Sequence, residues 1–229
     1  MILTRDLRKT FGPVQALAGL SFAMAEGELA ALLGANGAGK STLLHLLSGL
    51  SRPSFGSAEV AGFDVRRQPQ EVRRRIGVVS HQTFLYEDLS AEENLHFYGR
   101  MYGVAGLQKR SDELLAMMEL WPRRTDLVRT FSRGMQQRLG LARAMLHQPT
   151  VLLLDEPFTG LDLHAIDLLT RFIEEASAGR VTVLMTLHDP DYALAHSRRL
   201  FVLHQGRLVI DQPSEQVRKG DILPFFREK

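Results

Sequence analysis

Residues 34–41 read Gly-Ala-Asn-Gly-Ala-Gly-Lys-Ser, which matches the pattern G-x-x-x-x-G-K-[ST]. An apolar run at residues 29–34 leads into this stretch, and a helical pattern follows it and should end at Gly49. Glycines let the backbone turn so that several N–H groups point at one anion, and the start of the helix adds the positive end of its dipole. The stretch therefore indicates a strand, a phosphate-binding loop and a helix.

The side chains of this loop suit a nucleotide triphosphate. Lys40 can reach the terminal phosphates, and the hydroxyl of Ser41 can hold Mg²⁺. A plain Gly-rich turn ahead of a helix is the alternative, but the flanking strand and helix favour nucleotide binding. The residues expected to contact the nucleotide here are Gly34, Asn36, Gly37, Ala38, Gly39, Lys40, Ser41 and Thr42.

A second apolar run, residues 151–154, ends in the two carboxylates Asp155 and Glu156. The carboxyl end of a buried strand is where open α/β sheets bind their ligands. Asp155 can join the magnesium shell, and Glu156 can orient and polarise an attacking water. Such a pair alone would more often be structural, but with the phosphate loop upstream it indicates hydrolysis, because binding and switching need only the first acid.

Short apolar runs alternate with helical patterns along the chain, as expected for an α/β fold in which helices cover a sheet. Ser90 and Glu93 form a capping box, so a helix should begin there. The other expected elements are buried strands at residues 76–80 and 181–186, a helix over 162–178, and a hairpin that turns at 204–206.

Residues 84–146 read as almost entirely helical between two strand-rich parts. We interpret them as a helical lobe inserted into a core made of residues 1–83 and 147–210. The remaining residues, 211–229, are too few for a further domain. A single domain is expected, since single cores grow to roughly 250–300 residues.

Composition narrows the function classes. The 229 residues carry a formal net charge of only +2, so nucleic acid is not an expected partner. The chain has no cysteine, which excludes disulfides, Cys-based metal sites and thiol nucleophiles. Nothing approaches the roughly 18 uninterrupted apolar residues of a membrane span, so we expect a soluble chain whose membrane role would come through a partner.

Five further features accompany the two motifs, and all seven occur along the chain in a characteristic order. Each has a duller interpretation alone: a polar surface residue, a histidine at a strand end, or aromatic packing. The features are Phe11, Gln82, residues 131–138 (Phe-Ser-Arg-Gly-Met-Gln-Gln-Arg, the signature segment), residues 159–162 (Thr-Gly-Leu-Asp, the D-loop) and His188. Together, over roughly residues 3–211, they resemble the nucleotide-binding subunit of ATP-binding cassette (ABC) transporters.

The resemblance implies a P-loop NTPase (RecA-like) core with a mixed sheet, an N-terminal antiparallel β part and the inserted helical lobe. It implies that ATP and Mg²⁺ are bound, and that Phe11 stacks on adenine. It also implies that Gln82 and Asp155 join the magnesium shell with Ser41. Glu156 would orient water, and the γ-phosphate would contact His188.

The signature segment departs from the commonest form, Leu-Ser-Gly-Gly-Gln. Arg133 replaces the first glycine and Met135 the glutamine, whereas Ser132 and Gly134 remain. Ser132 is also suited to cap the helix that follows. This variant resembles exporter-type subunits of the ABC-2 group, and it leaves open what Arg133 contacts.

In the family, two subunits pack head to tail, so each ATP would face Ser132, Gly134 and the D-loop residue Asp162 of the other copy. The resemblance thus implies a homodimer that drives a separate integral-membrane permease from the cytoplasmic face of the membrane. The apolar and aromatic stretch at residues 84–103 lies where the permease would dock, although most of its side chains must pack the helical lobe itself.

The sequence says little about the transported substrate, because in this family the permease holds the substrate-binding pocket. Residues 49–53, 93–98 and 155–159 resemble the ATPase of the haem exporter used in cytochrome c maturation, and they overlap with drug and lipid exporters of the ABC-2 type. A non-transport ABC ATPase of the iron–sulfur assembly type is the alternative from another class.

Overall fold

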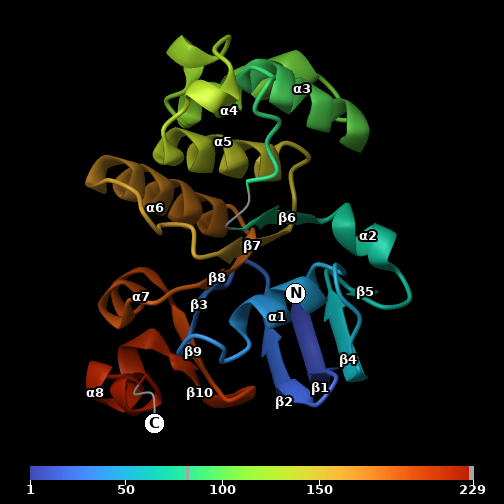
Figure 1. The fold of residues 1–229 in the computed structure, drawn as a ribbon, viewed down its shortest axis with the longest axis vertical. Helices are drawn as coiled ribbons and strands as arrows, with labels where there is room; N and C mark the ends of the chain where they lie inside the picture. Colours follow the sequence, from blue (N-terminus) through green and yellow to red (C-terminus); the bar gives the residue numbers. More distant parts are fainter. Residues whose placement is uncertain (81–82, 227–229) are drawn as a thin grey trace.

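The computed structural model describes residues 1–80 and 83–226, and its strands form two sheets (Figure 1). The larger sheet has the strand order β10-β9-β3-β8-β7-β6. All its neighbouring pairs are parallel except β10 with β9, the expected hairpin. The strands are β3 (Leu29–Leu33), β6 (Ile76–Val79), β7 (Val151–Asp155), β8 (Thr182–Thr186), β9 (Arg199–His204) and β10 (Arg207–Pro213).

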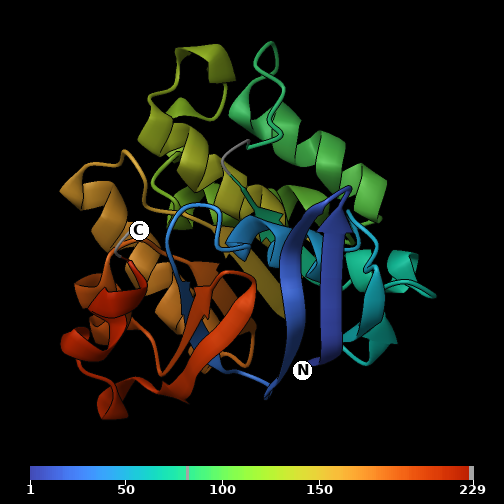
Figure 2. The ribbon, with the colours of Figure 1, turned by 60° about the horizontal axis from the view of Figure 1, so that its bottom comes forward.

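The smaller sheet is antiparallel, with the order β2-β1-β4-β5. Its strands are β1 (Ile2–Phe11), β2 (Val14–Met24), β4 (Phe55–Val60) and β5 (Phe63–Asp64), and α2 (Pro69–Arg73) follows them. Figure 2 shows the blue N-terminal strands beside the orange-red β10, and a backbone hydrogen bond of 2.8 Å from Ala18 to Gly206 joins these regions. The mixed sheet and the N-terminal antiparallel part agree with the fold class expected from the sequence.

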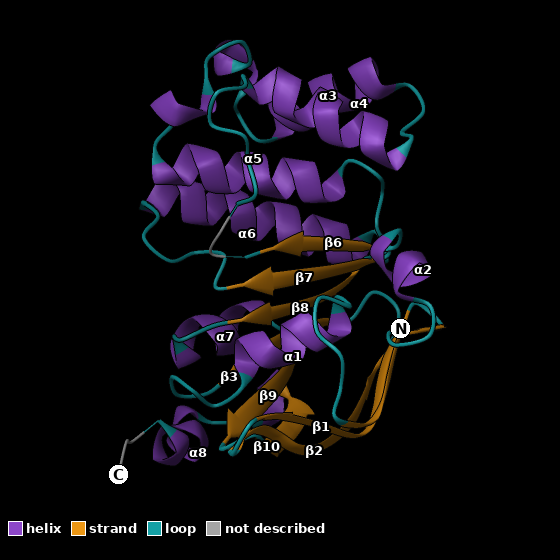
Figure 3. Cartoon of the chain, turned by 45° about the vertical axis from the view of Figure 1, so that its right-hand side comes forward, coloured by secondary structure: helices purple, strands orange, loops and turns teal. Residues whose placement is uncertain are grey.

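Strands β3, β7 and β8 of the larger sheet are buried on both faces, because successive side chains alternate between two apolar clusters, whereas the edge strand β10 is largely exposed. Ala30 and Leu32 of β3 pack with helix α1 (Lys40–Leu47) and the smaller sheet. Ala31 and Leu33 belong to the opposite cluster. Figure 3 shows α1 on one side of these strands and helices α5 (Arg133–Met145) and α6 (Leu163–Ala178) on the other.

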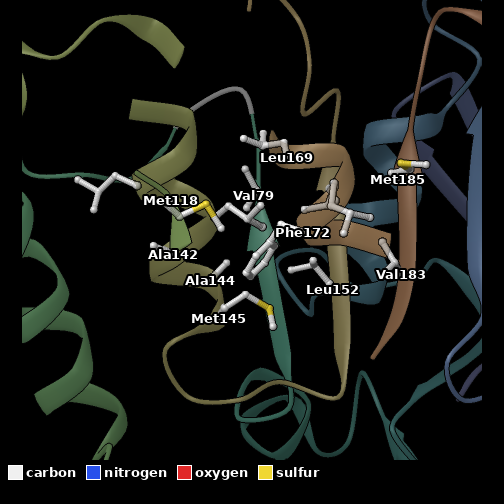
Figure 4. Packing of buried hydrophobic residues seen from close by; sticks show 14 of the residues in the cluster. Val79, Met118, Ala142, Ala144, Met145, Leu152, Leu169, Phe172, Val183 and Met185 are labelled. Atoms are coloured by element: carbon white, nitrogen blue, oxygen red, sulfur yellow. The ribbon is translucent and has the colours of Figure 1, made fainter. Parts of the chain in front are cut away.

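Figure 4 shows the second cluster from close by, with Phe172 of α6 lying between Leu152 of β7 and Ala144 and Met145 of α5. The cluster thus ties the helical segment to the sheet. Between residues 84 and 146 the described elements are all helical: α3 (Ala91–Tyr102), α4 (Leu107–Met117), the 3₁₀ turns η1 (Trp121–Arg123) and η2 (Val128–Thr130), and α5. The expected capping box of α3 is present, with the Ser90 hydroxyl accepting from the Glu93 N–H at 3.1 Å.

The chain closes with α7 (Pro190–His196) and the short elements η3 (Ser214–Gln216), α8 (Lys219–Ile222) and η4 (Leu223–Phe225). Buried Ile222 joins the cluster that α7 contributes to through Ala193. No helix among the described residues is long and apolar enough to cross a membrane.

Candidate functional site

The phosphate-binding loop connects β3 to α1, and glycine at its last position is a steric requirement. Gly39 caps α1 with φ +108°, and a Cβ atom there would lie 2.6 Å from the Ala16 carbonyl oxygen and 2.8 Å from Leu17 Cδ2. The loop is also held from the other side, since the Gly206 N–H donates to the Ala38 carbonyl at 3.0 Å. The N-terminus of α1 therefore has a fixed position at the carboxyl end of β3.

Lys40 lies inside this loop with only 6% of its surface exposed. Its ammonium donates to the carbonyl oxygens of Gly34 at 2.7 Å and Ala35 at 3.3 Å. Burial lowers the pKa of Lys40, and the negative charges of Glu156 and Asp155 act in the opposite direction. The two acids at the end of β7 thus act on the lysine of the loop, so the two motifs form one site.

One hydroxyl joins the two acids to the neighbouring strand. Asp155 pairs with Thr186 across β7 and β8, and it is almost fully buried. The Thr186 hydroxyl donates to Asp155 Oδ1 at 2.6 Å and accepts the backbone N–H of Glu156 at 2.9 Å. The carboxylate of Asp155 is therefore oriented before any ligand binds.

Glu156 and His188 are in direct contact through Glu156 Oε1 and His188 Nε2. The backbone of Glu156 is in the left-handed region, with φ +52°, which is uncommon for a residue with a side chain. Thr159 donates its hydroxyl to Glu156 Oε2 at 3.4 Å and its N–H to the Glu156 carbonyl at 3.3 Å. The expected water-orienting acid and the expected phosphate-sensing histidine thus lie together.

The signature segment and the D-loop meet at the N-termini of α5 and α6. Ser132 is exposed and caps α5 by accepting the Met135 N–H at 3.3 Å, as the sequence indicated. Asp162 caps α6 by accepting the Ala165 N–H at 2.8 Å. A Cβ atom on Gly134 would lie 3.5 Å from that of Ala165, so the two helix starts are packed together.

The remaining expected site residues that the structure describes lie around the phosphate-binding loop or at the end of β1. Phe11 ends β1 with 53% of its surface exposed, and Lys9 Nζ lies 4.8 Å from its ring centre. Asn36 and Gly37 are exposed in the loop, and Ser41 and Thr42 are half-buried in the first turn of α1. Gln82 lies outside the described residues.

Comparison with known proteins agrees with this arrangement. The family model described as ABC transporter matches residues 17–159. NatA of Bacillus subtilis, an ABC transporter ATP-binding protein, is 34% identical over 94% of this chain and 91% of its own length. The chain belongs to the ABC transporter family.

Two further matches define the type of ABC protein. The daunorubicin resistance ATP-binding protein DrrA2 of Streptomyces coeruleorubidus is 38% identical over 93% of this chain and 66% of its own length. The dimeric post-hydrolysis state of the cassette MJ0796 bound to ADP and Pi superposes with a TM-score of 0.82 at 27% identity, over 93% of this chain and 99% of that one. This chain is an ATP-binding ABC ATPase of the exporter type.

Thr186 was not found by sequence reasoning. It is the last residue of an expected strand, and a threonine at a strand end has no pattern of its own. The only available signal was register, because parallel pairing of 151–155 with 182–186 places Thr186 beside Asp155. In this ABC ATPase the hydroxyl that orients both acids thus comes from a residue outside every motif.

Proposed function

We propose that this ABC ATPase works as a homodimer that holds two ATP molecules with Mg²⁺ between its copies. The observation that carries this proposal is that α1 and α5 pack on opposite faces of the larger sheet. A nucleotide that needs both the phosphate loop and the signature segment would then take them from two copies. The similar cassette MJ0796 is dimeric in its structure with ADP and Pi, which supports a dimer here.

The donor groups at the site fit Mg²⁺. The hydroxyl of Ser41 and the carboxylate of Asp155 are hard oxygen ligands, and Mg²⁺ is usually held by one or two protein ligands with phosphates and water supplying the rest. The described residues contain no group of three or more His, Asp or Glu side chains that could hold a metal alone. The metal would therefore arrive with ATP and neutralise charge on its phosphates, with Gln82 expected as a further ligand.

This chain's own residues would divide the work of hydrolysis. Lys40 would exchange the loop carbonyls that it now contacts for phosphate oxygens, which suits a buried cation better. Glu156 would orient and polarise the attacking water, with Thr186 and Thr159 holding its backbone and its carboxylate. His188 would separate from Glu156 and contact the γ-phosphate. The side chain of His188 is 42% exposed, so a ligand can reach it.

The decisive experiment replaces the water-orienting acid. Glu156→Gln should abolish steady-state ATP hydrolysis while ATP binding persists, and ATP should convert the variant to a stable dimer on a sizing column. The physical reason is that the amide keeps the shape of the side chain but cannot polarise water. Normal turnover by Glu156→Gln would remove Glu156 from this role, and a variant that stays monomeric with bound ATP would contradict the shared site.

We further propose that the homodimer docks on a separate integral-membrane permease through the surface after Gln82. Four large side chains of residues 84–103 are exposed, namely Phe84, Tyr86, Phe97 and Met101, and the rings of Tyr86 and Phe97 pack edge to face with centres 4.8 Å apart. Leu50 and Phe84 also line a cavity of about 280 Å³ whose lining is mainly apolar. The exposed residues, here called the docking surface, are Leu50, Phe84, Tyr86, Phe97 and Met101.

We propose that the transporter exports an amphipathic drug or lipid. This chain would act at the cytoplasmic face of the membrane. This proposal is supported by relatives that include daunorubicin resistance and bacitracin transport proteins. Haem export is the second candidate, because of the sequence details at residues 49–53, 93–98 and 155–159. Purifying the native complex and testing which compound stimulates its ATPase activity separates the two.

A further inference from the structure

Arg133 is the residue of the signature segment whose partner the sequence left open, and the structure gives it one. It is exposed at the first position of α5, and its guanidinium lies on Gly160 of the D-loop. A Cβ atom on Gly160 would be 3.2 Å from each of Cζ, Nε and Nη1 of Arg133. Three equal distances require that the flat face of the guanidinium, and not its edge, covers Gly160.

Glycine at position 160 suits this contact in two ways. Its φ is +74°, a conformation that costs other residues free energy. A methyl group at this position would also push against the guanidinium. Among the described residues Arg133 forms no hydrogen bond or ion pair, so its guanidinium is not held by another polar group and lies on this turn.

The turn that Arg133 covers leads directly to Glu156. Thr159, the residue before Gly160, contacts Glu156 through its hydroxyl and its N–H. The next residue, Leu161, donates its N–H to the Phe158 carbonyl at 3.3 Å. The D-loop is thus a short hydrogen-bonded turn that lies between the guanidinium of Arg133 and the carboxylate of Glu156.

We propose that Arg133 is a positioning residue that holds the D-loop turn in the conformation that orients Glu156. A signature segment with glycine at this position has no side chain to cover the turn. The inference rests on the proposed function, because Ser132 beside Arg133 would meet the nucleotide of the second copy. Arg133 then connects closure of the dimer on one nucleotide to the orientation of Glu156 at the other.

The first test is steady-state kinetics of Arg133→Ala, with Arg66→Ala as the control for loss of an exposed arginine elsewhere. Arg133→Ala should lower kcat about tenfold and change KM for ATP by less than about twofold, because a misplaced reacting group slows the chemical step and leaves binding intact. Arg66 is exposed before α2, and its replacement should leave both parameters unchanged.

The second test asks whether Gly160 is the partner. Gly160→Ala should lower kcat by a larger factor in the wild-type background than in the Arg133→Ala background, where the added methyl group meets no guanidinium. The third test adds Arg133→Ala to Glu156→Gln. ATP should still produce the stable dimer, because Ser132 and Gly134 keep their places at the nucleotide.

Three results would overturn the inference. The first is an unchanged kcat for Arg133→Ala. The second is that the kcat factors of Arg133→Ala and Gly160→Ala multiply independently. The third is a raised KM together with loss of the ATP-dependent dimer, which would place Arg133 on the nucleotide of the second copy. None of these touches the proposed function, which fails separately if wild-type protein does not hydrolyse ATP or if Glu156→Gln still does.

Discussion

Thr186 makes one hydrogen bond to each of the two acids that the proposed reaction uses, and its replacement tests the site at the scale of single atoms. Thr186→Val keeps the shape of the side chain but removes the donor to buried Asp155 and the acceptor of the Glu156 N–H. We expect a fall in kcat of about tenfold or more, because both acids lose their fixed orientation. The variant should also lose about 1–3 kcal/mol of unfolding free energy, since two buried polar groups lose a partner.

Thr186→Ser is the matched control, because it retains the hydroxyl and loses only a methyl group. It should recover most of the turnover in the same ATPase assay, and chemical denaturation should show a smaller stability loss. If Thr186→Ser is as slow as Thr186→Val, packing of the methyl group matters more than the hydrogen bonds.

The site residues that lie in contiguous motifs could be predicted from the sequence. The contacts that depend on strand register or helix packing could not. The phosphate-binding loop with Lys40 carries all its functional groups within a few consecutive residues. The same holds for the acid pair Asp155 and Glu156. Thr186 and the Arg133 contact depend on the register of β8 beside β7 and on the packing of α5 against the D-loop. These relations span about 30 residues, and no local pattern encodes them.

At the scale of elements, Tyr192 of α7 links three parts of the site. Its ring lies 4.7 Å from that of Phe158, which follows Glu156 and Pro157. Its hydroxyl contacts the Thr170 hydroxyl of α6. With Glu156 and His188, it lines a cavity of about 240 Å³. α6, α7 and the segment that leads into the D-loop therefore share one aromatic side chain beside Glu156 and His188.

Two variants of Tyr192 should separate its ring from its hydroxyl. Tyr192→Phe should retain kcat within about twofold, because the ring contacts remain and the Thr170 hydroxyl still donates to the Ile166 carbonyl at 2.7 Å. Tyr192→Ala should lower kcat more than Tyr192→Phe, because a half-buried aromatic ring that supports Phe158 is lost. Burial raises the pKa of Tyr192 to about 12, so neither effect should vary between pH 6 and pH 9. Equal kcat values for the two variants would contradict a supporting role for the ring.

Most elements of the larger sheet and the main helices were predictable, because their signals are local. The capping residues Ser90, Ser132 and Asp162 start helices where the sequence has helix-start signals, and the apolar runs became buried strands. The order of strands was not predictable in the same way. β1 pairs with β4 across more than 50 residues, with register shifts that single-sequence patterns do not specify.

At the scale of the whole molecule, the larger sheet separates two functions. Its α1 face joins the phosphate loop to the smaller sheet, whereas its α5 and α6 face joins the signature segment and the D-loop to the helical part. The sheet positions both sets of groups through buried apolar contacts, and no described helix provides a route into the membrane. The proposed coupling to a permease would therefore use a surface of the helical part, on the face that carries the signature segment and the D-loop.

The docking surface can be tested with two methionines of the same helical part. Met101 of α3 is 62% exposed within the docking surface, and Met117 of α4 is 46% exposed outside it. Met101→Glu should remove the ATPase from the membrane fraction of its native cells, because an unpaired carboxylate would be desolvated in an apolar contact. Met117→Glu should stay membrane-associated, and both purified variants should hydrolyse ATP at the wild-type rate. Membrane association that survives Met101→Glu, or that both variants lose equally, would place the permease contact elsewhere on the chain.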